Sequence, residues 1–283
     1  MGRPAAFFRL IRPVNCLMVG FAIIVGVVMG GGASLFGQPL ELLLAFLTGF
    51  ALTGSAMSIN DYYDREIDAI NEPGRPIPSG AVKPGEALGA SILLSAVGLA
   101  ASWGTGPENL AIAVLAWLTM VVYSTVGKRT GLPGNLMVSA CIALPFIYGG
   151  VMVGGEALGP SLLFSSIAFL TCLGREVTKG IVDIEGDQAS GVRTVAVSRG
   201  VKAAALLSAL FYVSAVVVSI LPLYFGLVSF WYVPFVAVTD LGLAYLSFSL
   251  MREPSRENSR SVKNRVLPLM MSGLLGFLAG GLI

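Results

Sequence analysis

Apolar residues fill the chain in long, nearly uninterrupted runs, and most charged residues lie between these runs or near their ends. Nine runs are each about twenty residues long, the length at which an α-helix spans the hydrocarbon layer of a membrane. The pattern predicts an all-α membrane protein whose residues 1–283 form a single transmembrane domain. The expected spans are residues 14–31, 40–59, 86–103, 109–127, 136–154, 161–178, 201–222, 230–250 and 265–283.

The distribution of lysine and arginine predicts the orientation of these helices, because such residues collect in cytoplasmic loops. With nine spans and a cytoplasmic N-terminus, all 18 Lys and Arg residues fall on one side of the membrane. The loops of the other side carry only Glu41, Glu108 and Glu156 near helix ends. We therefore expect a multi-pass protein of the cell membrane with a cytoplasmic N-terminus.

The amino-acid composition excludes several kinds of partner and catalytic group. The net charge of +2 is spread over separate loops, so no nucleic-acid partner is expected. Histidine is absent, which removes imidazole bases and most zinc or haem ligation. The three cysteines lie inside predicted helices, where a free thiol behaves as a small apolar group. Carboxylates are left to carry most of the chemistry.

A first carboxylate cluster, "NDYYDREID" at residues 60–68, follows the second apolar run. Asp61, Asp64 and Asp68 are spaced by three and four residues, so on a helix they share one face, with Asn60 one turn before Asp64. Crowded carboxylates either take up protons or bind cations, and hard oxygen ligands favour Mg²⁺ shared with a phosphate. The alternative is a solvated acidic helix end.

A second cluster, "REVTKGIVDIEGD" at residues 175–187, follows the sixth run in the same way. Its charged residues Arg175, Lys179, Asp183 and Asp187 are spaced by four, whereas Glu185 points elsewhere. An intrahelical ladder of ion pairs, Lys179 to Asp183 especially, is the alternative interpretation.

Similar segments follow the two clusters, "RPIPSGAVK" at 75–83 and "RTVAVSRGVK" at 193–202. They indicate pseudo-repeated four-helix halves after a leading helix, with the clusters facing each other across a central cavity open to the cytoplasm. Such a cavity suits a diphosphate with a long hydrocarbon tail. Its phosphates would meet Mg²⁺ and the basic residues Arg75, Lys83, Lys128, Lys179 and Arg193.

These motifs resemble those of the UbiA superfamily of intramembrane prenyltransferases. "NDYYDREID" is similar to its N-D-x-x-D-x-x-x-D signature and "DIEGD" to its second aspartate motif, and "RPIPSG" and "YSTVGKR" also match. The resemblance spans nearly the whole chain. Within the superfamily, "RPVN" at 12–15 and the second cluster resemble the archaeal enzymes that add a second geranylgeranyl group to geranylgeranylglyceryl phosphate.

The resemblance implies Mg²⁺-dependent transfer of a prenyl group from its diphosphate to a lipid-soluble acceptor. Asn15 and Tyr123 are expected to orient the acceptor or shield the allylic cation. One departure is Gly180, where many members carry a further aspartate. The implied metal-binding residues are Asn60, Asp61, Asp64, Asp68, Asp183 and Asp187, and the five aspartates are the implied catalytic residues.

Two other functions fit the sequence less well. An aromatic acid of the 4-hydroxybenzoate type is an alternative acceptor, although the basic set, with Arg12, favours a glyceryl phosphate. A secondary transporter would carry its charges near the bilayer midplane, whereas these clusters lie at one membrane face. Asp240, in the middle of the eighth run, is expected to form a hydrogen bond with another helix.

Overall fold

The structure is a computed structural model that describes residues 3–31, 33–154 and 157–282, and every regular element in these ranges is a helix. The all-α prediction is confirmed. Glu156 lies outside the described residues. The α-helices and the 3₁₀ helices η1 and η2 are, in chain order, α1 Arg3–Ile11, α2 Pro13–Met29, η1 Ala33–Gly37, α3 Pro39–Asn71, α4 Pro84–Trp103, α5 Pro107–Thr125, η2 Gly127–Thr130, α6 Leu132–Val153, α7 Leu158–Val182, α8 Ile184–Ala189, α9 Val195–Arg199, α10 Val201–Ser219, α11 Leu221–Tyr224, α12 Tyr232–Arg252 and α13 Arg256–Leu282.

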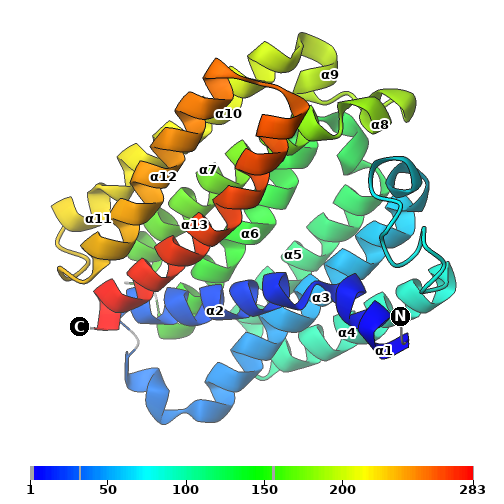
Figure 1. Cartoon of the computed structure of the whole chain (residues 1–283). Helices are drawn as coiled ribbons and strands as arrows, with labels where there is room; N and C mark the ends of the chain where they lie inside the picture. Colours follow the sequence, from blue (N-terminus) through cyan, green and yellow to red (C-terminus); the bar gives the residue numbers. More distant parts are fainter. Residues whose placement is uncertain (1–2, 32, 155–156, 283) are drawn as a thin grey trace.

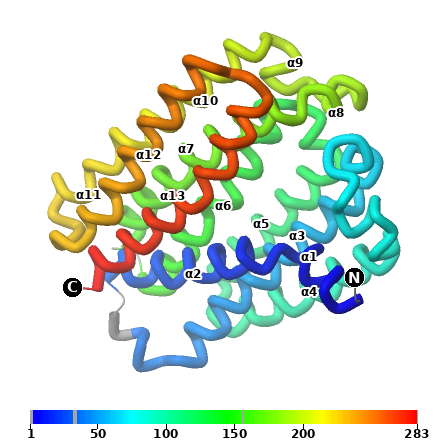
Figure 2. The backbone as a smooth tube through the Cα atoms, viewed as in Figure 1, coloured from blue at the N-terminus to red at the C-terminus, as the bar shows by residue number. Residues whose placement is uncertain are grey.

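The long helices pack side by side as one bundle (Figure 1). α2 contacts α3, α6 and α13, so the last helix of the chain packs beside the N-terminal part. The turn after α3, helices α8 and α9 and the α12–α13 turn lie at one end of the bundle (Figure 2). α11 and the C-terminus lie at the other end. Both carboxylate clusters belong to the first of these ends.

Eight of the described helices are long and apolar enough to cross a membrane: α3, α4, α5, α6, α7, α10 with α11, α12 and α13. The expected span 14–31 falls on α2, which has 17 residues. It is long enough to cross a membrane only when it is taken together with α1. These two helices are bent by 44° relative to each other. α1 and the short helices α8 and α9 were not anticipated from the sequence.

Large apolar side chains cover the outside of the bundle. Leu93, Trp103 and Leu241 are all more than 60% exposed, and many other leucines and phenylalanines are exposed as well. Soluble monomers rarely expose a continuous apolar surface of this kind. The outer surface is therefore suited to lipid.

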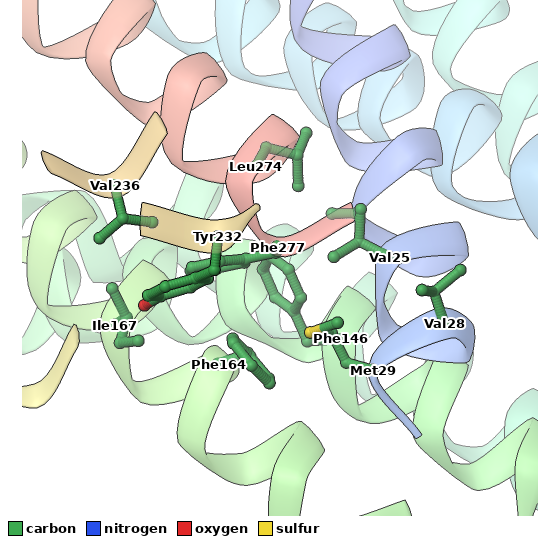
Figure 3. Packing of buried hydrophobic residues seen from close by; sticks show 11 residues of the cluster. Val25, Val28, Met29, Phe146, Phe164, Ile167, Tyr232, Val236, Leu274 and Phe277 are labelled. Atoms are coloured by element: carbon green, nitrogen blue, oxygen red, sulfur yellow. The ribbon is translucent and has the colours of Figure 1, made fainter. Parts of the chain in front are cut away.

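Aromatic rings pack together in one of the buried clusters, where α7, α12 and α13 meet (Figure 3). The ring of Phe277 stacks on that of Tyr232 with centroids 6.0 Å apart, and it also contacts Phe164 at 4.7 Å. Offset and tilted ring pairs of this kind stabilise a core beyond their buried area. The cluster holds α13 against α7 and α12.

Glycines allow α2 and α6 to approach closely. A Cβ atom on Gly149 would overlap the backbone of Ile23 and Val27, and one on Gly26 would overlap the backbone of Phe146. Small residues at such crossings let helix backbones pack directly against each other in membrane proteins. This contact sets the separation of two helices that line the central cavity.

Candidate active site

The first aspartate motif lies on the last turns of α3, which runs well past residue 59, the end expected for the second span. Asp61, Asp64 and Asp68 are 1%, 3% and 4% exposed, respectively. They share one helical face, as their spacing predicts, and that face points into the protein. Because the face is buried, the helix continues through a segment that hydropathy alone assigns to a loop.

A cationic side chain from another segment holds each of these carboxylates. Arg12 Nη2 lies 2.5 Å from Asp61 Oδ1, and Arg75 Nη1 lies 2.5 Å from Asp68 Oδ2. Lys128 Nζ pairs with Asp64, which also accepts a hydrogen bond from Asn60 Nδ2 at 2.7 Å. The mutual repulsion of the buried carboxylates is thereby offset.

The geometry of the two arginines supports this arrangement. Arg12 lies at the α1–α2 bend with φ 52°, the only non-glycine residue with positive φ in the described part of the chain. Such strain is typical of functional positions. Burial alone would lower the pKa of Arg75, but the carboxylates of Asp68 and Asp61 outweigh it and raise the pKa above its ordinary value. Arg75 is therefore firmly cationic.

The second motif lies where α7 ends. Asp183 caps the C-terminus of α7, and Asp187 lies on α8, which begins directly afterwards. Burial, with a contribution from Asp183, raises the pKa of Asp187 to about 6. A bound cation would favour its ionised form. Glu185 points away, as expected, and pairs with Arg256 at 2.8 Å.

The two motifs are brought together by a close contact at Gly186. A Cβ atom on Gly186 of α8 would overlap the side chain of Asn71, the last residue of α3. The two helix ends therefore touch, and their carboxylates line one cavity of about 70 Å³. Asp64, Asp68, Asp183 and Asp187 line this acidic cavity, as do Asn60 and Lys179. Asp61 does not line it and is held by Arg12 and Arg75.

The loop that carries Lys128 is fixed by a contact with the segment after α8. Gly131, at φ +74°, has no room for a Cβ atom against the carbonyl of Arg193, whose N–H donates to the Arg129 carbonyl at 3.4 Å. Arg193 thus contributes its backbone, while its side chain is exposed. Lys83 is also exposed and caps α4. Neither side chain lines the acidic cavity or the larger apolar cavity beside it.

A larger apolar cavity of about 280 Å³ adjoins the acidic one. Seven residues line both cavities and so mark their boundary: Arg12, Asn60, Arg75, Tyr123, Glu176, Lys179 and Lys263. Asn15 lines the apolar cavity. The other walls of the apolar cavity are mostly aliphatic and aromatic side chains of α2, α5, α6, α7 and α13. The arrangement accommodates an anionic head group above a hydrocarbon tail.

Two boundary residues were missed in the sequence. Glu176 is buried and pairs with Arg175 at 3.3 Å and with Lys179 at 3.6 Å. Lys179 therefore forms its ion pair with Glu176, and not with Asp183 as in the intrahelical ladder that the four-residue spacing permitted. Lys263 belongs to a basic segment that indicated only topology. Glu176 could have been proposed from the sequence, because it is a carboxylate next to Arg175 at the end of an apolar run.

The oxygen donors of the acidic cavity suit Mg²⁺. Asn60 Oδ1 and Asn71 Oδ1 are buried in its wall and have no hydrogen-bond partner among the described residues. Within those same residues, no three acidic or cysteine side chains are gathered closely enough to hold an ion. Arg12, Arg75 and Lys128 occupy the carboxylates instead. The donor set fits the ion once these cations move to an anionic ligand.

Comparison with known proteins identifies the family of this chain. The model of the UbiA prenyltransferase family matches residues 18–273. The digeranylgeranylglyceryl phosphate synthase of Korarchaeum cryptofilum (strain OPF8) is 37% identical, over 98% of each chain. A solved structure described as a digeranylgeranylglyceryl phosphate synthase is 30% identical over 99% of each chain, with a TM-score of 0.76.

A UbiA homologue from Archaeoglobus fulgidus, solved with GPP and Mg²⁺ bound, shares the fold. Its TM-score is 0.64 at 17% identity, over 96% of this chain and 99% of the other. A helical membrane bundle with two aspartate motifs above an apolar cavity defines a class of intramembrane prenyltransferases. This chain belongs to the UbiA prenyltransferase family.

Proposed function

We propose that this protein transfers a geranylgeranyl group from its diphosphate to geranylgeranylglyceryl phosphate in archaeal ether-lipid synthesis, with Mg²⁺ as cofactor. The observation that carries the proposal is the identity of 37%, over almost the full length of both chains, with a relative named for this activity. The acidic cavity above an apolar one supports the same chemistry.

The donor binds with its diphosphate in the acidic cavity and its hydrocarbon tail in the apolar one. Arg75 and Lys128 transfer their N–H groups from Asp68 and Asp64 to phosphate oxygens, since an arginine or lysine pairs with either anion. The released aspartates, with Asn60, would hold Mg²⁺, which would neutralise charge on the diphosphate. Asp183 and Asp187 act in the same way from the opposite side.

Chemistry begins when the bond between C1 of the prenyl group and the diphosphate oxygen breaks, and the electron pair leaves with the diphosphate. Preorganised cations stabilise the growing charge on the leaving group. The allylic cation remains beside Tyr123, whose ring can stabilise positive charge. The acceptor hydroxyl oxygen then bonds to C1, and its proton passes to the diphosphate. Positioning replaces activation by a base, so the absence of histidine is no obstacle.

The proposed topology has nine spans, a cytoplasmic N-terminus, the active site facing the cytoplasm, and two related halves of four helices. The distribution of lysine and arginine supports this orientation. The bent pair α1 and α2 is the first span in this proposal.

Single cysteines test the orientation after the three native cysteines have been replaced. We expect Gly85→Cys and Arg129→Cys to react with a membrane-impermeant maleimide only from the cytoplasmic side, and Glu108→Cys only from the outside. All three positions are exposed or open in the structure. The reverse pattern at any one of them contradicts the nine-span topology.

The acceptor is tested with purified protein, Mg²⁺ and labelled geranylgeranyl diphosphate. We expect transfer to geranylgeranylglyceryl phosphate and a loss of at least about tenfold when the acceptor's phosphate is removed, because charge-assisted hydrogen bonds to the phosphate are then lost. Extraction and chromatography of the labelled lipid measure the product. Transfer to 4-hydroxybenzoate with none to the glyceryl phosphate would contradict the proposed acceptor.

A further inference from the structure

The cations around the two cavities fall into two groups. Six arginine and lysine side chains line the acidic cavity, the apolar cavity or both. Arg12, Arg75 and Lys128 form one group, and each is paired with an aspartate of the first motif. This group is matched by carboxylates on its own side of the cavity. In the proposed function it serves the metal and the diphosphate.

The second group lies on α7 and α13 and has more positive charge than its partners neutralise. Arg175 and Lys179 share one carboxylate, Glu176, and Arg175 Nε is buried without a hydrogen-bond partner among the described residues. Lys263 forms no ion pair with a described residue. The carboxylates that act on it, Asp183 and Glu72, lie beyond ion-pair distance. These three cations therefore have only one carboxylate among them as an ion-pair partner, and they keep N–H donors that no described side chain accepts.

The face of α13 below Lys263 is apolar. Leu267, Met270 and Leu274 follow Lys263 at steps of four, three and four residues, so all four side chains lie on one helical face. All of them line the apolar cavity, whereas only Lys263 also reaches the acidic one. The face thus presents a cation at the head-group level and a continuous hydrocarbon contact beneath it.

We infer that Lys263, together with Lys179 and Arg175, binds the phosphate of the prenylated glycerol acceptor, whose tail lies along the apolar face of α13. The inference rests on the proposed function and assigns a place to its second substrate. A phosphate monoester carries between one and two negative charges near neutral pH, which matches the surplus on this wall. The two anionic groups of the reaction then have separate sets of cations. The diphosphate lies against α3, and the acceptor phosphate lies against α7 and α13.

The test is a comparison of Lys263→Gln with the wild type in steady-state transfer assays. We expect the KM for geranylgeranylglyceryl phosphate to rise at least about tenfold, as expected for the loss of one charge-assisted contact. The KM for geranylgeranyl diphosphate stays within about twofold of the wild-type value. Transfer to geranylgeranylglycerol, which lacks the phosphate, is unchanged. Lys263→Arg restores most of the affinity for the phosphorylated acceptor.

Arg265→Gln is the matched control, because it removes the same charge from the same helix at an exposed position that lines none of the described cavities. We expect it to leave both KM values unchanged. An equal loss with both acceptors, or a rise only in the KM for the diphosphate, would overturn the phosphate site. Wild-type-like kinetics of Lys263→Gln would overturn it as well. Failure of the wild type itself to use the glyceryl phosphate would instead overturn the proposed function.

Discussion

Replacing Asp64 or Asp183 with alanine is expected to abolish prenyl transfer, with a loss of at least about 10²–10³-fold in kcat. The two residues come from different motifs but line the same cavity. Each substitution therefore removes one proposed Mg²⁺ ligand from a different side of that cavity. Excess chelator is expected to have the same effect on the wild type, and added Mg²⁺ to reverse it. The measurement is transfer of labelled geranylgeranyl diphosphate by purified protein of verified monodispersity.

Asp240→Asn provides the matched control. Asp240 lies on α12 away from both motifs and accepts a hydrogen bond from Ser219 of α10 at 2.7 Å, as expected from the sequence. The amide oxygen of asparagine can still accept this bond, so activity should be retained. Substantial transfer by Asp64→Ala or Asp183→Ala, or by the wild type in excess chelator, would refute the model of two cooperating motifs.

Gly149→Leu is expected to destabilise the bundle by about 3 kcal/mol, near the upper end of the usual cost of overpacking. Even a Cβ atom at this position overlaps the backbone of α2, and a leucine would force α2 and α6 apart. The apparent melting temperature in detergent should fall by about 10 °C. Thermal unfolding followed by intrinsic fluorescence measures the effect.

Gly89→Leu is the control for this substitution. Gly89 lies inside α4, is exposed, and apart from its chain neighbours and the backbone of its own helix has no atom within 4 Å of its would-be Cβ. Leucine has the higher helix propensity, so the melting temperature should stay unchanged or rise. Equal stability of Gly149→Leu and the wild type would show that the α2–α6 crossing does not depend on direct backbone contact.

Much of the fold could be predicted from apolar run length, because a spanning helix needs a nearly fixed number of apolar residues. The same criterion fails where a helix leaves the apolar layer. α3 was expected to end near residue 59, yet it continues to Asn71 because its aspartates face inward. α1 was missed because it is short and carries two arginines, and it counts toward a membrane span only together with α2.

The aspartates of the site could be predicted because a helix converts sequence spacing directly into a shared face. The basic residues could not be assigned in this way. Lys83 and Arg193 follow the motifs in sequence but are exposed, whereas Lys263 comes from a distant helix and lines both cavities. Which cation reaches a cavity depends on how loops and helices pack, and no local pattern records that packing.

The length of α3 bears on how the protein meets its substrates. Its 33 residues extend roughly 50 Å, whereas the hydrocarbon layer is about 30 Å thick. When the apolar part of α3 spans that layer, Asp61 to Asp68 lie at the depth of the lipid head groups. In the proposed reaction both substrates are lipids that keep their anionic groups at this depth, so they meet by diffusion within a two-dimensional leaflet. Turnover then follows the mole fraction of each substrate in the leaflet, and dilution with inert lipid slows the reaction even when bulk concentrations are constant.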